Sequence, residues 1–145
     1  MMYYAEFMPK RLREKGVFEA IDWVMVELDL PENLHVSIEW KTFDDGTHGE
    51  VWEEGYFEED DEIWFTIHLH RSLGKDNTIR AVFHEMVHIK QYTSGRLRHT
   101  PKTSYWVGKE IPPTTPYSQK PWEIEAYEQE VLLLKKFKKH IYEAH

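Results

Sequence analysis

Two histidines and a glutamate stand at a spacing that could hold a metal ion and activate water: His84, Glu85 and His88. On a helix, residues four apart lie one above the other on the same face, so both imidazoles can bind one zinc ion. The glutamate after the first histidine can then reach a water molecule at the open zinc position, whose pKa falls toward about 7. The pattern predicts a hydrolytic centre with Zn2+ as cofactor, His84 and His88 as ligands, and Glu85 as general base.

The third protein ligand must come from farther along the chain. Gln91 and Ser94 stand three and six residues after the second histidine, where a metzincin has glycine and histidine, so that type is excluded. The last predicted helix begins with Glu123 and Glu125, and only one can point at the metal, because helix residues two apart face different directions. His99, in the loop before that helix, is a further candidate.

A hydrolase of this kind also uses a hydrogen-bond donor beside the metal, which stabilises the negative oxygen of the transition state. Three side chains in the loop between the predicted ligands could supply it: Tyr105, Tyr117 and His99. We select Tyr117 as the candidate catalytic donor. The alternative is that a tyrosine in such a loop packs with its hydroxyl in water.

An HExxH motif on one helix followed by a glutamate on the next resembles the gluzincin branch of zinc metallopeptidases. The resemblance spans residues 76–130 and is carried by HEMVHIKQYTSG, Trp106, Gly108, Tyr117 and PWEIEA. These segments are similar to small single-domain HExxH proteins of bacteria and phages. The order of elements also resembles the minimal zincin core of ImmA/IrrE-type and SprT-like proteins. The resemblance implies a zinc metallopeptidase that acts on peptide or protein substrates.

In gluzincins with an ExxxD pattern, the glutamate is the ligand and the aspartate orients one histidine. Carried onto this chain, the ligand is Glu123, with Glu125 in reserve, whereas the aspartate position holds Tyr127. The hydrogen-bond partner that a ligating histidine normally needs must then come from elsewhere. SprT-like proteins use a third histidine, for which His99 is the candidate.

The periodicity of apolar residues predicts the elements that position these side chains. Three helices are predicted, at 10–28, 77–95 and 121–144. Three strands are predicted, at 34–43, 51–58 and 62–70. Residues 96–121 hold five of the seven prolines and are expected to form a long irregular loop that walls the cleft.

Short connections between the strands favour an antiparallel meander. The expected fold is therefore α+β, as one domain over residues 1–145. A three- or four-stranded, mainly antiparallel sheet packs on the first helix and the HExxH helix, and the last helix brings Glu123 to the metal. The zincin resemblance suggests that strand 62–70 is an edge strand that pairs with extended substrate, and the alternative is an ordinary interior strand.

The amino-acid composition excludes several other kinds of site and argues against several kinds of partner. Cysteine is absent, which excludes thiolate zinc sites, iron–sulfur clusters and cysteine nucleophiles. The formal net charge of −8 argues against nonspecific binding to nucleic acid or to anionic membranes. No segment approaches the ~20 apolar residues of a membrane span, and no signal-like apolar run follows a basic start. A cytoplasmic protein is expected.

Two alternatives remain at this point. One is a zinc hydrolase that acts on a non-protein substrate. The other is a non-catalytic binding module of zincin shape, whose metal is structural or lost. A structural site has no need of Glu85 as a base and tends to have four protein ligands, so the enzyme is favoured. The sequence carries no signal of an oligomer.

Overall fold

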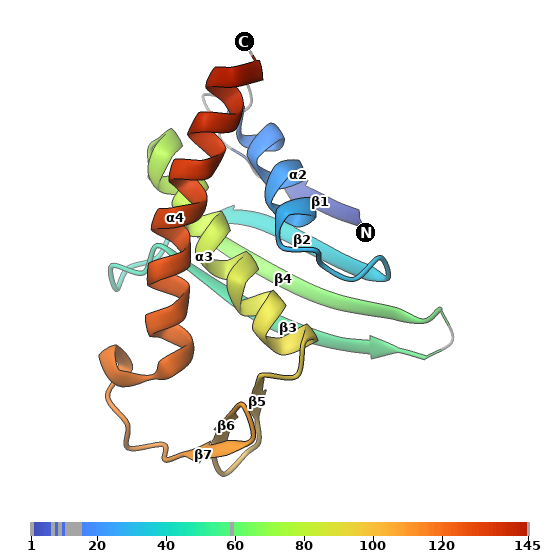
Figure 1. The fold of residues 1–145 in the computed structure, drawn as a ribbon, viewed down its shortest axis with the longest axis vertical. Helices are drawn as coiled ribbons and strands as arrows, with labels where there is room; N and C mark the ends of the chain where they lie inside the picture. The colour runs from blue at the N-terminus through green and yellow to red at the C-terminus, as the bar shows by residue number, and fades with distance from the viewer. Residues whose placement is uncertain (1, 7, 9, 11–15, 59, 145) are drawn as a thin grey trace.

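The chain folds as a four-stranded sheet with three helices over one face and a small second sheet at one end (Figure 1). The computed structural model describes residues 2–6, 8, 10, 16–58 and 60–144. The strands are β1 (Met2–Glu6), β2 (Leu34–Lys41), β3 (Gly49–Phe57), β4 (Glu62–His70), β5 (Leu97–His99), β6 (Ser104–Trp106) and β7 (Lys109–Ile111). The helices are α2 (Val17–Glu27), α3 (Lys75–Thr93), α4 (Pro121–Ala144) and a 3₁₀ turn at Tyr117–Gln119. This combination confirms the α+β class.

The main sheet is mixed, so the prediction of a mainly antiparallel meander is wrong. Its strand order is β1-β2-β4-β3, in which β2 runs parallel to both neighbours and only β3 and β4 pair as antiparallel strands. The segment 42–48 connects β2 to β3 across the width of β4. This distance is only about 10 Å, because neighbouring strands lie about 4.8 Å apart. β2 and β4 bury alternate side chains under the helices, whereas β3 is mostly exposed, so the least buried strand takes the edge. Residues 62–70 therefore form an interior strand.

Two regions contain strands that the sequence does not predict. β1 is a five-residue stretch, too short for an apolar period to stand out. The predicted irregular loop 96–121 holds the antiparallel sheet β5-β6-β7 and the 3₁₀ turn. The β6–β7 hairpin turns at Val107 and Gly108, with φ of 50° and 79°. Such turns favour Asn-Gly, and a β-branched valine at positive φ gives no turn signal.

The helices agree with their predicted positions. α3 and α4 cover residues 75–93 and 121–144, and α2 ends at Glu27. Residues 11–15 of the predicted first helix lie outside the described residues. None of the described helices combines the length and the apolar character that crossing a membrane requires.

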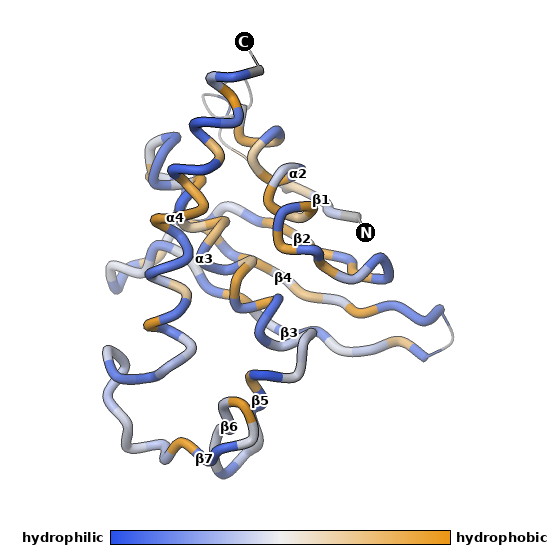
Figure 2. The backbone as a smooth tube through the Cα atoms, in the orientation of Figure 1, coloured by the Kyte–Doolittle hydropathy of each residue, from blue (hydrophilic) through white to orange (hydrophobic). Residues whose placement is uncertain are grey.

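An aromatic cluster ties the three helices together. The ring of Trp23 on α2 lies 5.7 Å from Phe83 on α3 and 5.3 Å from Phe137 on α4, and the two phenylalanine rings are 5.9 Å apart. Hydrophobic and hydrophilic residues alternate along α4, and β4 is hydrophobic where α3 crosses it (Figure 2). Because α4 is held against α3 at this cluster, its first turn reaches the middle of α3, where the HExxH motif lies.

Replacement of Phe137 by alanine should lower the free energy of unfolding by about 3–5 kcal/mol, because a buried aromatic side chain leaves a cavity. Leu132→Ala on the same helix is the matched control. Its side chain is 57% exposed, and its loss should cost no more than about 0.5 kcal/mol. Urea unfolding with a chelator present measures both values. Equal losses in the two variants would contradict this packing.

Candidate metal centre

The side chains of His84, His88 and Glu123 meet at one buried point, and we call these three residues the ligand cluster. Each offers one ligand atom, and these atoms all lie within 4.8 Å of one another. The two Nε2 atoms are 3.1 Å apart, and they lie 3.0 Å (His84) and 3.2 Å (His88) from Glu123 Oε1. Two ligands of a tetrahedral zinc ion, with bonds of about 2.0–2.1 Å, lie about 3.3 Å apart. The donor set and its spacing therefore fit a metal ion of that size.

Two helices supply the ligand cluster. His84 and His88 are one turn apart on α3, within the stretch 81–89 in which every residue is buried. Glu123 is in the first turn of α4, two residues after Pro121, and proline favours the first position of a helix. The sequence prediction that these three residues share one site agrees with their placement.

The other candidates for the third ligand point elsewhere. Glu125 forms two hydrogen bonds of 2.7 Å with the guanidinium of Arg96. The Nδ1 of His99 lies 2.6 Å from Ser104 Oγ, and its ring packs 5.6 Å from that of Trp122. Neither residue belongs to the ligand cluster.

The ring nitrogen of His88 that faces away from the ligand cluster, Nδ1, is hydrogen-bonded to the side-chain amide of Gln91, whose orientation is fixed. Gln91 Nε2 donates to the Trp122 carbonyl at 3.0 Å and to Glu125 Oε1 at 3.1 Å, so its oxygen must face the histidine. His88 Nδ1 donates to that oxygen at 2.8 Å. The tautomer with the proton on Nδ1 leaves the Nε2 lone pair free toward the ligand cluster, as metal binding requires.

The outward nitrogen of His84 is held by a carboxylate that the sequence reading misses. Glu130 Oε1 lies 3.3 Å from His84 Nδ1. Tyr127, at the position where gluzincins have aspartate, packs its ring 4.6 Å from the imidazole instead. Glu130 is seven residues after Glu123, two helical turns along the same face, and that spacing could have identified it. Gln91 could likewise have been found three residues after His88.

Charge balance inside the ligand cluster favours ionised groups. Burial lowers the pKa of His84, but hydrogen bonds with Glu123 and Glu130 outweigh it and raise the value to about 9. Burial likewise opposes ionisation of Glu123, yet the bonds with both histidines bring the pKa of its carboxyl below the ordinary range. The ligand cluster therefore pairs the Glu123 carboxylate with imidazolium.

Glu85 differs from the other buried carboxylates, because it has no hydrogen-bond partner among the described residues. It is 6% exposed, and burial raises the pKa of its carboxyl to about 7, although the nearby His88 and His84 oppose the shift. The side chain lines a cavity of about 620 Å³, which we call the α3 cavity. A carboxyl with this pKa and no protein partner is suited to exchanging a proton with a bound molecule.

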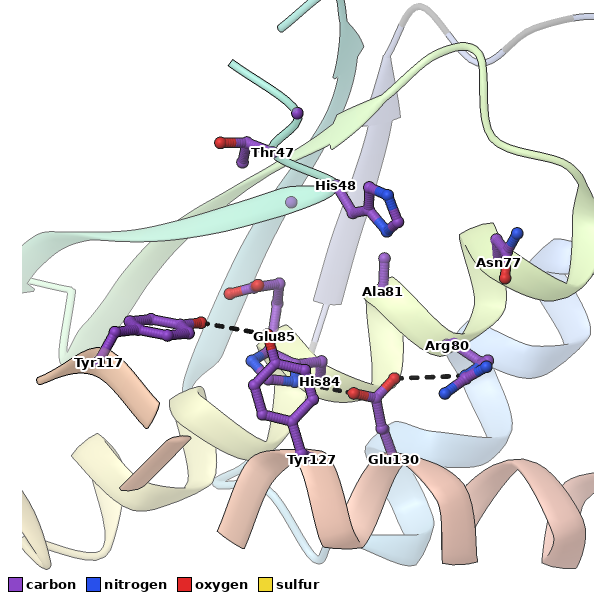
Figure 3. Close-up of a pocket in the computed structure, with 12 residues that line it drawn as sticks. Thr47, His48, Asn77, Arg80, Ala81, His84, Glu85, Tyr117, Tyr127 and Glu130 are labelled. Carbon is purple, nitrogen blue, oxygen red and sulfur yellow. Dashed lines mark hydrogen bonds and ion pairs between the residues drawn. The ribbon is translucent and has the colours of Figure 1, made fainter. Parts of the chain in front are cut away.

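Tyr117 lies at the edge of the same cavity. Its hydroxyl donates to Glu123 Oε1 at 2.8 Å and is 3.5 Å from the hydroxyl of Tyr127, which also lines the cavity (Figure 3). Burial and these two contacts raise the pKa of its hydroxyl, which keeps it a donor. Tyr105, the other tyrosine considered, packs on Arg98 in the small sheet. The structure thus places Tyr117 beside the ligand cluster, and its catalytic role stays a prediction.

The strand that borders the site is β3. A Cβ atom added at Gly49 would lie 3.6 Å from Glu85 Cγ, so the start of β3 passes close to this side chain. Residues 46–49 line the α3 cavity, and Val51, Trp52 and Glu53 line a second cavity of about 500 Å³ farther along β3. Among the described strands β3 pairs with β4 alone, which leaves its outer edge unpaired between the two cavities.

Removal of the Glu130 carboxylate should weaken metal binding without removing a ligand. Glu130→Ala frees the Nδ1 of His84, and loss of such a partner lowers metal affinity about 10- to 100-fold. Glu128→Ala removes the same charge from an exposed position of α4 and should leave the affinity unchanged. Competition with a chelating dye measures both. Equal affinities in the two variants would mean that Glu130 does not support the metal.

Metal affinity should rise with pH up to about 9. The metal-free His84 has a pKa of about 9, so near neutral pH a metal ion must displace its proton. Each proton displaced steepens the rise by up to about tenfold per pH unit. Calorimetry in buffers of different ionisation enthalpy counts the protons released. An affinity that stays level from pH ~6 to ~9 would show that His84 is not a ligand.

Comparison with known proteins does not indicate what this site does. No family model, no curated protein and no solved structure matches this chain. What the site does must therefore be inferred from the ligand cluster and the cavity beside it.

Proposed function

We propose that this protein is a zinc-dependent metallopeptidase. The observation that carries the proposal is the position of Glu85, a buried carboxyl with no described partner, in a cavity beside three converging metal ligands. A largely buried carboxyl that faces a cavity and has a pKa raised by burial is typical of functional sites. A metal site with a purely structural role would not need it.

The ligand cluster supports zinc as the cofactor. Two imidazole nitrogens and one carboxylate oxygen are a ligand set of catalytic zinc sites, which keep a further position open. Zinc in such a site polarises a carbonyl group and lowers the pKa of water. Four protein ligands would favour a structural site, and the described residues supply three.

The chain's own residues then have separate tasks. His84, His88 and Glu123 hold the metal, with His84 oriented by Glu130 and His88 by Gln91. Glu85 takes a proton from the attacking water and later delivers it to the leaving amine. Tyr117 would donate its hydroxyl to the negative oxygen that forms on the substrate carbonyl, once substrate draws it from Glu123.

A peptide substrate is supported by the β3 edge. An extended peptide can pair with the unpaired edge of a sheet through main-chain hydrogen bonds, with its side chains entering pockets along the strand. Here the free edge runs between two cavities, and Glu85 lies close to its first residues. A compact small molecule would have no use for such an edge.

Glu85→Gln tests the proposal, because it keeps the size of the side chain and removes the base. The variant should retain zinc, while kcat/KM for peptide cleavage falls about 10²- to 10⁴-fold. Glu128→Gln is the matched control and should cleave as the parent does. Zinc is measured by elemental mass spectrometry, and cleavage by mass spectrometry of a defined peptide mixture. Full cleavage by Glu85→Gln, or none by the zinc-loaded parent, would refute the proposal.

A further inference from the structure

The α3 cavity extends past the ligand cluster along the N-terminal half of α3. This end is polar and is lined by Thr47, His48, Asn77 and Arg80 (Figure 3). Arg80 is the only lysine or arginine among the described residues that line the cavity. It stands four residues before His84, so the two side chains leave the same face of α3 about 6 Å apart along the helix axis.

The Nε of Arg80 contacts a carboxylate, and the terminal nitrogens of its guanidinium can bind a ligand. Its Nε lies 3.4 Å from Glu130 Oε2, and its side chain is 43% exposed. The terminal nitrogens donate no hydrogen bond to a described residue. A guanidinium presents its remaining N–H groups as a planar fork, which matches the two oxygens of a carboxylate.

The two carboxylates of the cavity wall leave room for an anion at that fork. Of the two carboxylates that line the cavity, Glu130 is already shared between His84 and Arg80. The other, Glu85, is the proposed general base. Water can satisfy the terminal nitrogens of Arg80 in the free protein, and the ligand group complementary to them is an anion.

We propose that Arg80 binds a carboxylate of the substrate close to the bond that is cut. Arg80 and His84 leave α3 about 6 Å apart along the helix axis, and one extended residue spans about 3.3 Å, so we place this carboxylate one or two residues from the bond that is cut. The carboxylate is either the free C-terminus of the peptide or the side chain of an aspartate or glutamate. This inference rests on the proposed function and names its substrate class.

Binding of three hydroxamates to the zinc-loaded protein tests the inference without any turnover. Each probe carries the same zinc-binding hydroxamate, joined to alanine with a free carboxylate, to alanine amide, or to glutamate amide. At least one charged probe should bind about tenfold or more tightly than alanine amide, as a charge-assisted hydrogen bond allows. The charged probe with the larger gain identifies the source of the carboxylate.

Variants assign the gain to Arg80. Arg80→Gln should reduce the ratio of Kd values to near one, while zinc content and the Kd of alanine amide stay unchanged. Arg80→Lys should keep part of the ratio, because it keeps the charge but not the fork. Arg98→Gln is the matched control, since that guanidinium lines the second cavity, and it should keep the full ratio.

The outcomes separate the two proposals. If the parent binds zinc and all three probes equally well, or if Arg80→Gln keeps the ratio, the inference about Arg80 is wrong and the metal centre stands. If the parent binds no zinc, the proposed function fails, and the inference about Arg80 fails with it.

Discussion

A buried carboxylate between two imidazoles governs the arrangement of this molecule. Glu123 brings a negative charge into a place from which water is largely excluded, and such a charge is stable only with close partners. His84 and His88 supply them, and both come from one helix while the carboxylate comes from another. The site therefore depends on the packing of α3 against α4 being correct to within about 0.5 Å.

The rest of the structure supplies that packing. The aromatic rings of Trp23, Phe83 and Phe137 join the three helices at one end, and the ligand cluster joins α3 and α4 farther along. Between these points the side of α4 that faces the site presents Glu123, Tyr127 and Glu130 in sequence. Each outward nitrogen of the two histidines has a partner, so neither ring is free to turn. Side chains held in this way are ordered as the proposed metal binding requires.

The sequence alone predicts the parts of the site that depend on the spacing of residues along one helix. Residues four apart on a helix share a face, so the sequence predicts that His84 and His88 lie together. It also places the third ligand in the first turn of the last helix, as either Glu123 or Glu125. That choice needed tertiary information, because Arg96 draws Glu125 away from the ligand cluster.

Features that depend on contacts distant in sequence could not be read in this way. The insertion of β4 between β2 and β3 follows from relative burial of whole strands, which turn lengths do not encode. The β6–β7 hairpin uses Val107 at positive φ, a position that local propensity assigns to other residues. Glu130 was within reach of helical periodicity, since it lies on the same face as Glu123, but its pairing with His84 requires the two helices to be placed.

The most direct test of this account is the metal content of the purified chain after reconstitution with zinc, measured by elemental mass spectrometry. We expect roughly one zinc ion per chain, as for a single three-ligand site, and none in His84→Ala. His140→Ala, near the end of α4, should bind as the parent does. Absence of zinc from the parent, or one ion retained by His84→Ala, would contradict the assignment of His84, His88 and Glu123 as a metal centre.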